Sequence, residues 1–205
     1  MIANSKSSSE VEAPTAISGE KRKAIACVYV PQLMPTGQAH RFEFETRSLP
    51  GRRVVCGNSS VSWQEQATSA ENPLFAYVTS SSVLQLVRSR VGLEDVLDIS
   101  QTECWISRYR TGEYIGVHRD CAGIIQLLLC LRAPNSGNGG DLVLRLKQGD
   151  RSFSLKDGDG LLFRAAEIEH YTTELVPTKW CPNPVRVVAA ARYFVMSSHA
   201  DHLHP

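Results

Sequence analysis

The sequence has little excess charge of either sign. Its 22 Lys and Arg residues almost balance 21 Asp and Glu residues, so the formal net charge at pH 7 is +1. This balance gives no electrostatic reason to expect binding to nucleic acid or to a membrane surface. A long apolar run is also missing, and we therefore predict no transmembrane helix.

Cysteine pairs at short spacing are absent too. The six cysteines are Cys27, Cys56, Cys104, Cys121, Cys130 and Cys181. None belongs to a C-x-x-C pair, and several lie in apolar segments, so we expect reduced thiols in a cytoplasmic protein. An even number of cysteines allows disulfide bonds, but a chain of this size and apolar content does not need them.

The chain shows no internal repeat and no second domain. Residues 1–20 are rich in Ser, Glu and Ala without an apolar stretch, which predicts a disordered tail and not a signal peptide. Residues 21–198 suit one domain with a sizeable core. The His-rich residues 199–205 are expected to form a frayed C-terminal tail.

Periodicity predicts a mainly β fold with flanking helices. Strands are expected over 24–30, 42–46, 102–109, 124–131, 142–146, 161–164 and 185–195. A helix is expected over 82–91 and outside the major sheet, because Val83, Leu86 and Val87 share one helical face. The region from Pro31 to Pro73 gives the weakest pattern.

The most informative segment runs from Tyr109 to Asp120 and reads YRTGEYIGVHRD. His118 and Asp120 are two positions apart, and on extended backbone this spacing puts both side chains on the same face. His170 follows about fifty positions later, beyond a predicted core strand, where folding can bring it beside His118. Two His and one carboxylate on one face of a metal form the ligand set of non-haem Fe(II) oxygenases. The three remaining coordination positions would leave room for a cosubstrate and O₂.

The last predicted strand carries two arginines. Arg186 and Arg192 are separated by an even number of positions, so both point to one face of the sheet, where small residues such as Ala190 leave space. A guanidinium on an otherwise apolar face needs an anion, because an unpaired buried charge is very costly. Arginine binds carboxylates in a bidentate manner, which favours a dicarboxylate beside the metal.

These features resemble the Fe(II)/2-oxoglutarate-dependent oxygenases, and most closely their prolyl-4-hydroxylase-like branch. The resemblance covers roughly 104–195 and rests on Tyr109-x-x-Gly112 before His118-x-Asp120, the apolar strand ending at Leu131, Gly139-Gly140-Asp141-Leu142, and Asp157-Gly158-Asp159-Gly160-Leu161-Leu162-Phe163 before His170. It implies a double-stranded β-helix of the jelly-roll or cupin type, with Fe(II) bound by His118, Asp120 and His170. It also implies that Arg186 anchors the distal carboxylate of 2-oxoglutarate and that Tyr109 lines the same pocket.

The sequence departs from this branch at two places. Members usually carry the anchoring basic residue about ten positions after the distal His, whereas Arg186 lies sixteen after His170, beyond an apparent insertion at 177–184. Arg192 is the alternative anchor, and the spacing of the two arginines also resembles the nucleic-acid-demethylating branch. Cys130 stands near a position where the branch often has a Tyr that contacts 2-oxoglutarate. Trp180, inside the insertion, is either a packing aromatic or a substrate contact.

The resemblance implies hydroxylation of an unactivated C–H bond, with 2-oxoglutarate converted to succinate and CO₂ and with O₂ consumed. A small molecule or an amino acid is the expected substrate, selected by loops between Pro31 and Pro73. The alternatives are a peptidyl-prolyl hydroxylase, an oxygenase of the nucleic-acid-demethylating kind, and a non-catalytic binding or sensing relative. The sequence does not define the oligomeric state.

Overall fold

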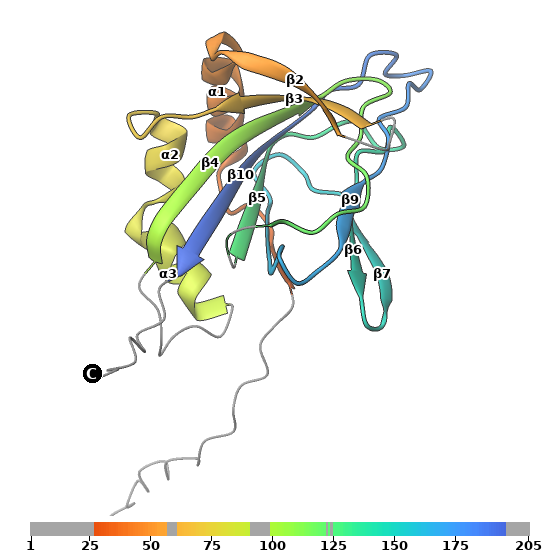
Figure 1. Cartoon of the computed structure of the whole chain (residues 1–205). Helices are drawn as coiled ribbons and strands as arrows, with labels where there is room; N and C mark the ends of the chain where they lie inside the picture. The colour runs from red at the N-terminus through yellow and green to blue at the C-terminus, as the bar shows by residue number, and fades with distance from the viewer. Residues whose placement is uncertain (1–26, 57–60, 91–98, 122, 124, 196–205) are drawn as a thin grey trace, which may run out of the picture.

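Two antiparallel sheets form the body of the computed structural model (Figure 1), which describes residues 27–56, 61–90, 99–121, 123 and 125–195. The larger sheet has the strand order β1-β8-β5-β10-β4-β3-β2, and the smaller one the order β7-β6-β9. The strands of the larger sheet are β1 (Cys27–Val30), β2 (Gly51–Cys56), β3 (Val61–Ala67), β4 (Ile99–Tyr109), β5 (Ile125–Arg132), β8 (Gly160–Phe163) and β10 (Arg186–Val195). Those of the smaller sheet are β6 (Leu142–Leu146), β7 (Gly149–Phe153) and β9 (His170–Thr172).

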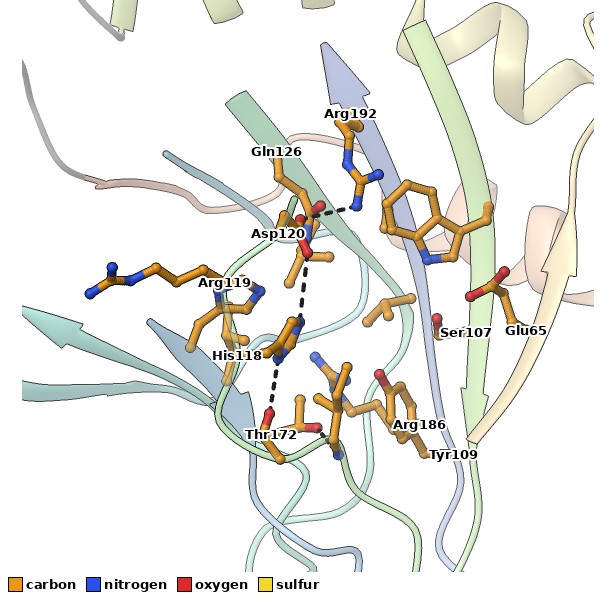
Figure 2. A pocket seen from close by; sticks show the side chains of 18 of the residues that line it. Glu65, Ser107, Tyr109, His118, Arg119, Asp120, Gln126, Thr172, Arg186 and Arg192 are labelled. Atoms are coloured by element: carbon orange, nitrogen blue, oxygen red, sulfur yellow. Dashed lines mark hydrogen bonds and ion pairs between the residues drawn. The ribbon is translucent and has the colours of Figure 1, made fainter. Parts of the chain in front are cut away.

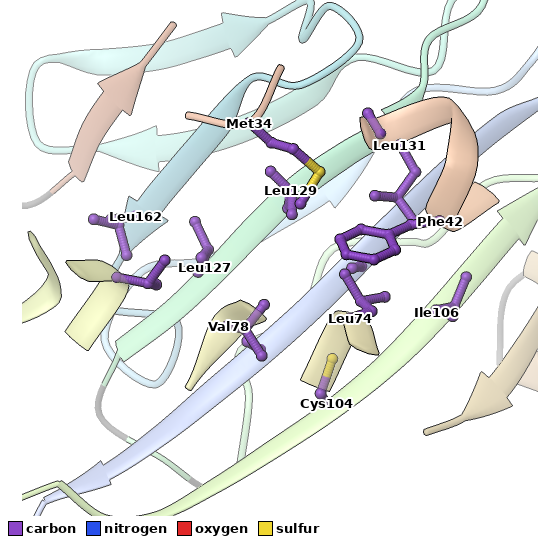
Figure 3. Close-up of a cluster of buried hydrophobic side chains, with 14 of the residues drawn as sticks. Met34, Phe42, Leu74, Val78, Cys104, Ile106, Leu127, Leu129, Leu131 and Leu162 are labelled. Carbon is purple, nitrogen blue, oxygen red and sulfur yellow. The ribbon is translucent and has the colours of Figure 1, made fainter. Parts of the chain in front are cut away.

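Helices cover one face of the larger sheet (Figure 1). They are α1 (Thr36–Glu45), the short 3₁₀ helix η1 (Thr46–Ser48), α2 (Pro73–Val78) and α3 (Ser81–Arg90). Their apolar side chains join those of the sheet in one buried cluster that includes Phe42, Leu74, Val78, Leu127 and Leu129 (Figure 3). Burial of this apolar area is the main stabilising contribution on this side of the molecule.

Strand β10 shows how the two faces of the larger sheet differ. Side chains alternate along a strand, and Val187, Ala189, Ala191 and Tyr193 belong to the core beneath the helices. The intervening residues Arg186, Val188, Ala190 and Arg192 line a cavity on the opposite face. The pairing of Arg186 with Tyr109 and of Ala190 with Trp105 extends this alternation to β4. One face of the sheet is therefore a packed core, and the other carries polar groups.

A second apolar cluster occupies part of the space between the two sheets. It contains Leu128, Leu142, Leu144, Leu161 and Phe163. The segment that precedes β5 closes this side of the molecule, because His118 and His170 form an antiparallel bridge at the edge of the smaller sheet. Two facing antiparallel sheets of this kind confirm the mainly β prediction and the double-stranded β-helix.

Most strands lie close to the predicted positions, and β6 has the predicted bounds. The helix predicted over 82–91 is confirmed as α3, with Val83 and Val87 buried. Residues 24–26 and 91, as well as the predicted tails 1–20 and 199–205, lie outside the described residues. No helix of the described chain is long and apolar enough to cross a membrane.

The strand predicted over 42–46 is wrong, because this segment forms the end of α1 and the start of η1. The alternating Phe42-Glu43-Phe44-Glu45 pattern also fits a helix that buries Ala39, Phe42 and Glu43 at spacings of three and four. Phe44 is left exposed. The buried Glu43 carboxylate accepts hydrogen bonds from Arg47 and Arg108, which makes the helical arrangement possible.

Candidate metal centre and its cavity

A cavity of about 620 Å³ lies on the inner face of the larger sheet. Strands β3, β4, β5 and β10 form one wall, and the segment 115–120 and β9 form the other (Figure 2). Its lining residues are Glu65, Trp105, Ser107, Tyr109, Ile115, Gly116, Val117, His118, Arg119, Asp120, Gln126, Leu128, Leu142, His170, Thr172, Arg186, Val188, Ala190 and Arg192. All six residues that the sequence predicted for the site are among them.

The structure brings His118, Asp120 and His170 together at this cavity. One ligand atom from each residue lies within 4.8 Å of those of the other two. His118 Nε2 is 3.6 Å from Asp120 Oδ1, and the two imidazole ring centroids are 4.2 Å apart. His118 forms an isolated bridge with His170, and Asp120 belongs to no strand, so the strand predicted for this pair is not formed, although both side chains line the cavity.

Backbone hydrogen bonds fix the positions of these residues. His118 N donates to His170 O and His170 N donates to His118 O, at 3.0 and 2.9 Å. Asp120 N donates to Ala165 O at 3.1 Å, so a backbone hydrogen bond also fixes Asp120, to the segment that precedes His170. The two histidines therefore face each other as partners of one β-bridge, although they are far apart in the sequence.

The hydrogen bonds of the two imidazoles define their tautomers. Nδ1 of His118 lies 2.9 Å from Gly116 O, and Nδ1 of His170 lies 2.9 Å from Ile168 O. A carbonyl oxygen can only accept, so each Nδ1 carries the proton and each Nε2 keeps its lone pair. Both lone pairs are then available to a metal ion, and the carbonyls orient the rings.

His170 is the more buried histidine. Burial lowers its pKa, and the nearby charges of His118 and Arg192 act in the same direction, whereas the Ile168 carbonyl and Asp120 oppose the change. The ring also contacts Phe163 edge to face, at 4.9 Å between centroids. A lowered pKa keeps the imidazole neutral, which is the form that binds metals.

Arg192 pairs with the outer oxygen of Asp120. Its Nη2 is 3.2 Å from Asp120 Oδ2, while Oδ1 faces His118. The guanidinium also lies 4.8 Å from the Trp105 ring centre and 3.5 Å from Glu103. Gly123, at φ +73°, packs against the Arg192 stem so closely that a Cβ there would collide with it. The arrangement leaves one carboxylate oxygen directed toward the histidines.

Both terminal nitrogens of Arg186 lack a hydrogen-bond partner in this cavity. The Arg186 side chain is only 2% exposed. The guanidinium lies 5.1 Å from the centre of the Tyr109 ring and points into the cavity (Figure 2). Burial raises the pKa of Tyr109, and the Arg186 charge opposes this rise. A buried unpaired guanidinium is costly, so the site calls for an anion.

Two further residues mentioned by the sequence analysis do not reach the cavity. Trp180 is 85% exposed and contacts Lys179 at 5.3 Å, so the interpretation of Trp180 as a packing aromatic is wrong, and the alternative, a substrate contact, has no support because Trp180 does not line the cavity. Cys130 is fully buried in the apolar cluster between the sheets, and burial raises the pKa of its thiol to about 12. Cys130 therefore does not line the cavity, and Tyr109 is the tyrosine that does.

Sequence reasoning missed several polar residues of the cavity. Glu65 comes from β3, in the region with the weakest pattern, and Ser107 lies opposite it on β4. Gln126 is buried, and its Oε1 has no hydrogen-bond partner. For Ser107 a signal was available, because the period of two that places Tyr109 in the cavity also places Ser107 and Trp105 there.

The residues present fit a divalent metal and a dicarboxylate. Two imidazole nitrogens and one carboxylate oxygen are the donor set expected for non-haem iron, and the Arg186 guanidinium, whose terminal nitrogens lack partners, fits a carboxylate that binds it in a bidentate manner. Both groups would occupy the same cavity, one at each end of the row formed by Arg186, Val188, Ala190 and Arg192.

Comparisons with solved structures identify the fold. A prolyl-4-hydroxylase from Pseudomonas putida is 16% identical, with a TM-score of 0.62 and with 82% of this chain and 92% of that chain covered. The collagen prolyl hydroxylase of Paramecium bursaria Chlorella virus-1, solved with 2-oxoglutarate, is 12% identical at a TM-score of 0.62, covering 82% and 96%. HygX from Streptomyces hygroscopicus, solved with nickel and 2-oxoglutarate, is 13% identical at 0.60, covering 82% of each chain.

These likenesses show that the chain has the double-stranded β-helix fold of the 2-oxoglutarate–Fe(II) oxygenases. No protein-family model matches the sequence, and no curated protein matches it. The role of each site residue consequently depends on the geometry described above.

Proposed function

We propose that the protein is an Fe(II)/2-oxoglutarate-dependent oxygenase that hydroxylates an unactivated C–H bond of a small molecule or amino acid. The observation that carries this proposal is the convergence, in one cavity, of two imidazole Nε2 atoms, one carboxylate oxygen and the unpartnered Arg186 guanidinium. A metal site alone would not need Arg186, and an anion site alone would not need the triad.

When bound, Fe(II) and 2-oxoglutarate would supply the oxidation, in which O₂ is consumed, 2-oxoglutarate becomes succinate and CO₂, and the substrate gains a hydroxyl group. His118, Asp120 and His170 would hold the metal through Nε2, Oδ1 and Nε2. Arg186 would hold the distal carboxylate of 2-oxoglutarate, and Tyr109 would limit the space beside it. Arg192 would keep Asp120 Oδ2 away from the metal, and so act on Asp120 and not on 2-oxoglutarate.

The apolar side chains of the cavity have a separate task in this proposal. Leu128, Leu142 and Val188 line the cavity together with Arg186 and the triad. They would exclude water from the reacting groups and leave room for a substrate C–H beside the metal. A cavity of about 620 Å³ is in the range that holds a small ligand.

Solved structures of this fold differ in what they bind. HygX has been solved with hygromycin B, and a prolyl hydroxylase from Trichoplax adhaerens has been solved with a peptide fragment. For this chain we favour a small substrate. Incubation with candidate peptides and with free amino acids, followed by mass spectrometry for the gain of one oxygen, separates the two possibilities.

The nucleic-acid alternative gains no support from the charges around the cavity. Arg119 pairs with Glu169 at 3.6 Å, Arg52 with Glu65 at 3.5 Å, and Arg53 with Glu113 at 3.0 Å. Phosphate binding requires an excess of cations that can replace counterions, and each of these arginines lies beside an acid, so they do not form a basic patch at the cavity. Weak, salt-insensitive binding of single-stranded DNA would agree with this reasoning.

The first experiment is anaerobic addition of Fe(II) and 2-oxoglutarate, with the visible metal-to-ligand charge-transfer band as the readout. The wild-type protein should develop the band, and His118→Ala should not, because removal of one ligand abolishes the triad. The substitution should likewise abolish substrate-dependent succinate formation. A folded wild-type protein without the band would refute the proposal and favour a non-catalytic binding protein.

A further inference from the structure

We propose that Glu65 binds a protonated amine, and therefore that the substrate class of this site is a cationic amine. The inference rests on the proposed function and adds to it, because neither the metal nor 2-oxoglutarate gives Glu65 a role. Glu65 would be a specificity-determining residue that holds the substrate at a point away from the oxidised carbon.

The strand register directs Glu65 into the cavity. It pairs with Ser107 of β4, which in turn pairs with Val188 of β10. Side chains that are directly opposite on neighbouring strands share one face of the sheet, and Ser107 and Val188 both line the cavity. In Figure 2 the Glu65 carboxylate lies beside Ser107, on the side of the cavity away from His118.

The other charged side chains of the cavity wall already have functions or partners. Asp120 and Arg192 pair with each other at 3.2 Å, and Arg119 pairs with Glu169 at 3.6 Å. Arg186 would take the distal carboxylate of 2-oxoglutarate. Among the described residues that line the cavity, Glu65 is then the one carboxylate outside the triad.

The partner that Glu65 has in the structure is a weak competitor. Arg52 Nη2 lies 3.5 Å from Glu65 Oε1, and the Arg52 side chain is 77% exposed while that of Glu65 is 28% exposed. Ion pairs of this exposed kind contribute little free energy. Arg52 comes from the edge strand β2, outside the cavity wall, so a ligand amine can displace it without breaking the core.

An ammonium group suits this position better than a hydroxyl or a carboxylate. A charge-assisted hydrogen bond to a carboxylate is about twice as strong as a neutral one. The indole of Trp105 lines the same cavity, but the Arg192 guanidinium already lies 4.8 Å from its ring centre, so the preference for a cation depends on the Glu65 carboxylate. A substrate carboxylate would be repelled by Glu65, so acidic substrates are disfavoured at this part of the site.

The test uses three probes with the same chain and different charge: n-pentylammonium, 1-pentanol and pentanoate. Each is titrated into the full-length protein, once alone and once with Zn(II) and 2-oxoglutarate added, and the indole N–H signal of Trp105 is followed by NMR. Trp105→Phe identifies this signal among those of the three tryptophans. Pentylammonium should shift the signal at lower concentration than pentanol, and pentanoate should not shift it.

The decisive comparison is between the two sides of the Arg52–Glu65 pair. Glu65→Gln keeps the size of the side chain and removes its charge, so binding of pentylammonium should weaken roughly fivefold. Arg52→Gln breaks the same pair and should leave that binding unchanged or make it tighter. Equal losses in both variants, or equal binding of pentanol and pentylammonium, would overturn the proposal.

A turnover screen gives a second, independent readout. Primary amines and their N-acetyl derivatives are incubated with Fe(II), 2-oxoglutarate and O₂, and products heavier by one oxygen are sought. Free amines should be oxidised and their acetylated partners should not, while Glu65→Gln raises KM more than it lowers kcat. If only neutral or acidic compounds were oxidised, the proposal that the substrate is a cationic amine would be refuted. A missing charge-transfer band would instead refute the proposed oxygenase function, and the probe titration would still test binding of an amine to Glu65.

Discussion

The two faces of the larger sheet differ in the partners that they provide for a buried arginine. Arg108 of β4 points to the helical face, where its Nη1 is 2.7 Å from the Glu43 carboxylate. Arg186 of β10 points to the cavity face, where both terminal nitrogens lack a partner. Both side chains are largely buried, so the difference does not come from access to solvent. Glu43 thus neutralises Arg108, whereas the terminal nitrogens of Arg186 remain available to a ligand.

The neighbouring apolar residues show the same division. Leu127 and Leu129 of β5 contribute to the core beneath the helices, whereas Leu128 between them lines the cavity. Substitutions on the helical face should therefore change stability, and those on the cavity face should change binding. The following predictions test this division in order of decreasing effect.

Replacement of Arg186 should cause the largest change. Arg186→Leu removes the guanidinium that we propose holds the distal carboxylate of 2-oxoglutarate, and we expect binding of 2-oxoglutarate to weaken about a hundredfold, since loss of one member of a buried charge pair costs several kcal/mol. The free energy of unfolding without ligand should not fall, because an unpartnered buried charge is removed. Calorimetric titration and urea denaturation measure the two quantities. A loss of stability with unchanged affinity would assign Arg186 to the core.

Adjacent leucines on β5 provide a matched pair. Leu129→Ala should lower the free energy of unfolding by about 2 to 5 kcal/mol, because it creates a void in a packed core. Leu128→Ala should cost less, since Leu128 already borders a cavity, but it should weaken binding of 2-oxoglutarate. Urea denaturation of wild type and of both variants measures the two losses in the free energy of unfolding. Equal destabilisation would show that the cavity face is packed as tightly as the core.

Substitution of Arg192 tests whether this residue positions the Asp120 carboxylate or anchors 2-oxoglutarate. Because it contacts Asp120 Oδ2, Arg192→Leu should reduce metal affinity about tenfold to a hundredfold, as is usual for residues that orient metal ligands. At saturating metal the affinity for 2-oxoglutarate should change little. Competition with a metal-binding dye gives the first value. The opposite pattern would make Arg192 the anchor in place of Arg186.

The smallest effect is expected for Glu43, the buried acid on the helical face of the larger sheet, and it concerns the dependence of stability on pH. Burial alone would raise the pKa of Glu43, but hydrogen bonds and charges from Arg47 and Arg108 outweigh it and lower the pKa below the ordinary value of 4.5. The stabilisation is therefore present above pH 4.5 and is lost as the pH falls through the lower, folded-state pKa. Melting temperatures measured from pH 6 to pH 3 should fall more steeply for wild type than for Glu43→Gln. Parallel curves would contradict this.

The sequence was sufficient for those parts of the site that depend on local spacing. His118-x-Asp120 and the six-residue interval between Arg186 and Arg192 follow from the period of an extended chain, and the structure places all four side chains at one cavity. The segment 42–46 was misread because alternation of Phe and Glu fits a strand and a helix equally well. Tertiary contacts with Arg108 decide between them, and these are not visible in a local pattern.

Glu65 illustrates a different limit. Its strand, β3, has no regular alternation of apolar and polar residues, and its place in the cavity follows from pairing with Ser107, a partner about forty positions away. Trp180 shows the reverse case, because an aromatic residue in an insertion predicted packing or a substrate contact and the structure leaves it in solvent. The place of Glu65 depends on long-range strand register, which one sequence does not reveal.

If His118 and His170 bind the metal as proposed, the β-bridge between them makes metal uptake a test of correct folding. A shift of one residue in strand pairing turns every side chain to the opposite face, so the two imidazoles would no longer face each other. Chains with the wrong register would then fail to hold iron, and the oxidising centre would form only where its enclosing walls are already in place. The ratio of bound metal to protein in a purified sample would thus count the correctly paired molecules.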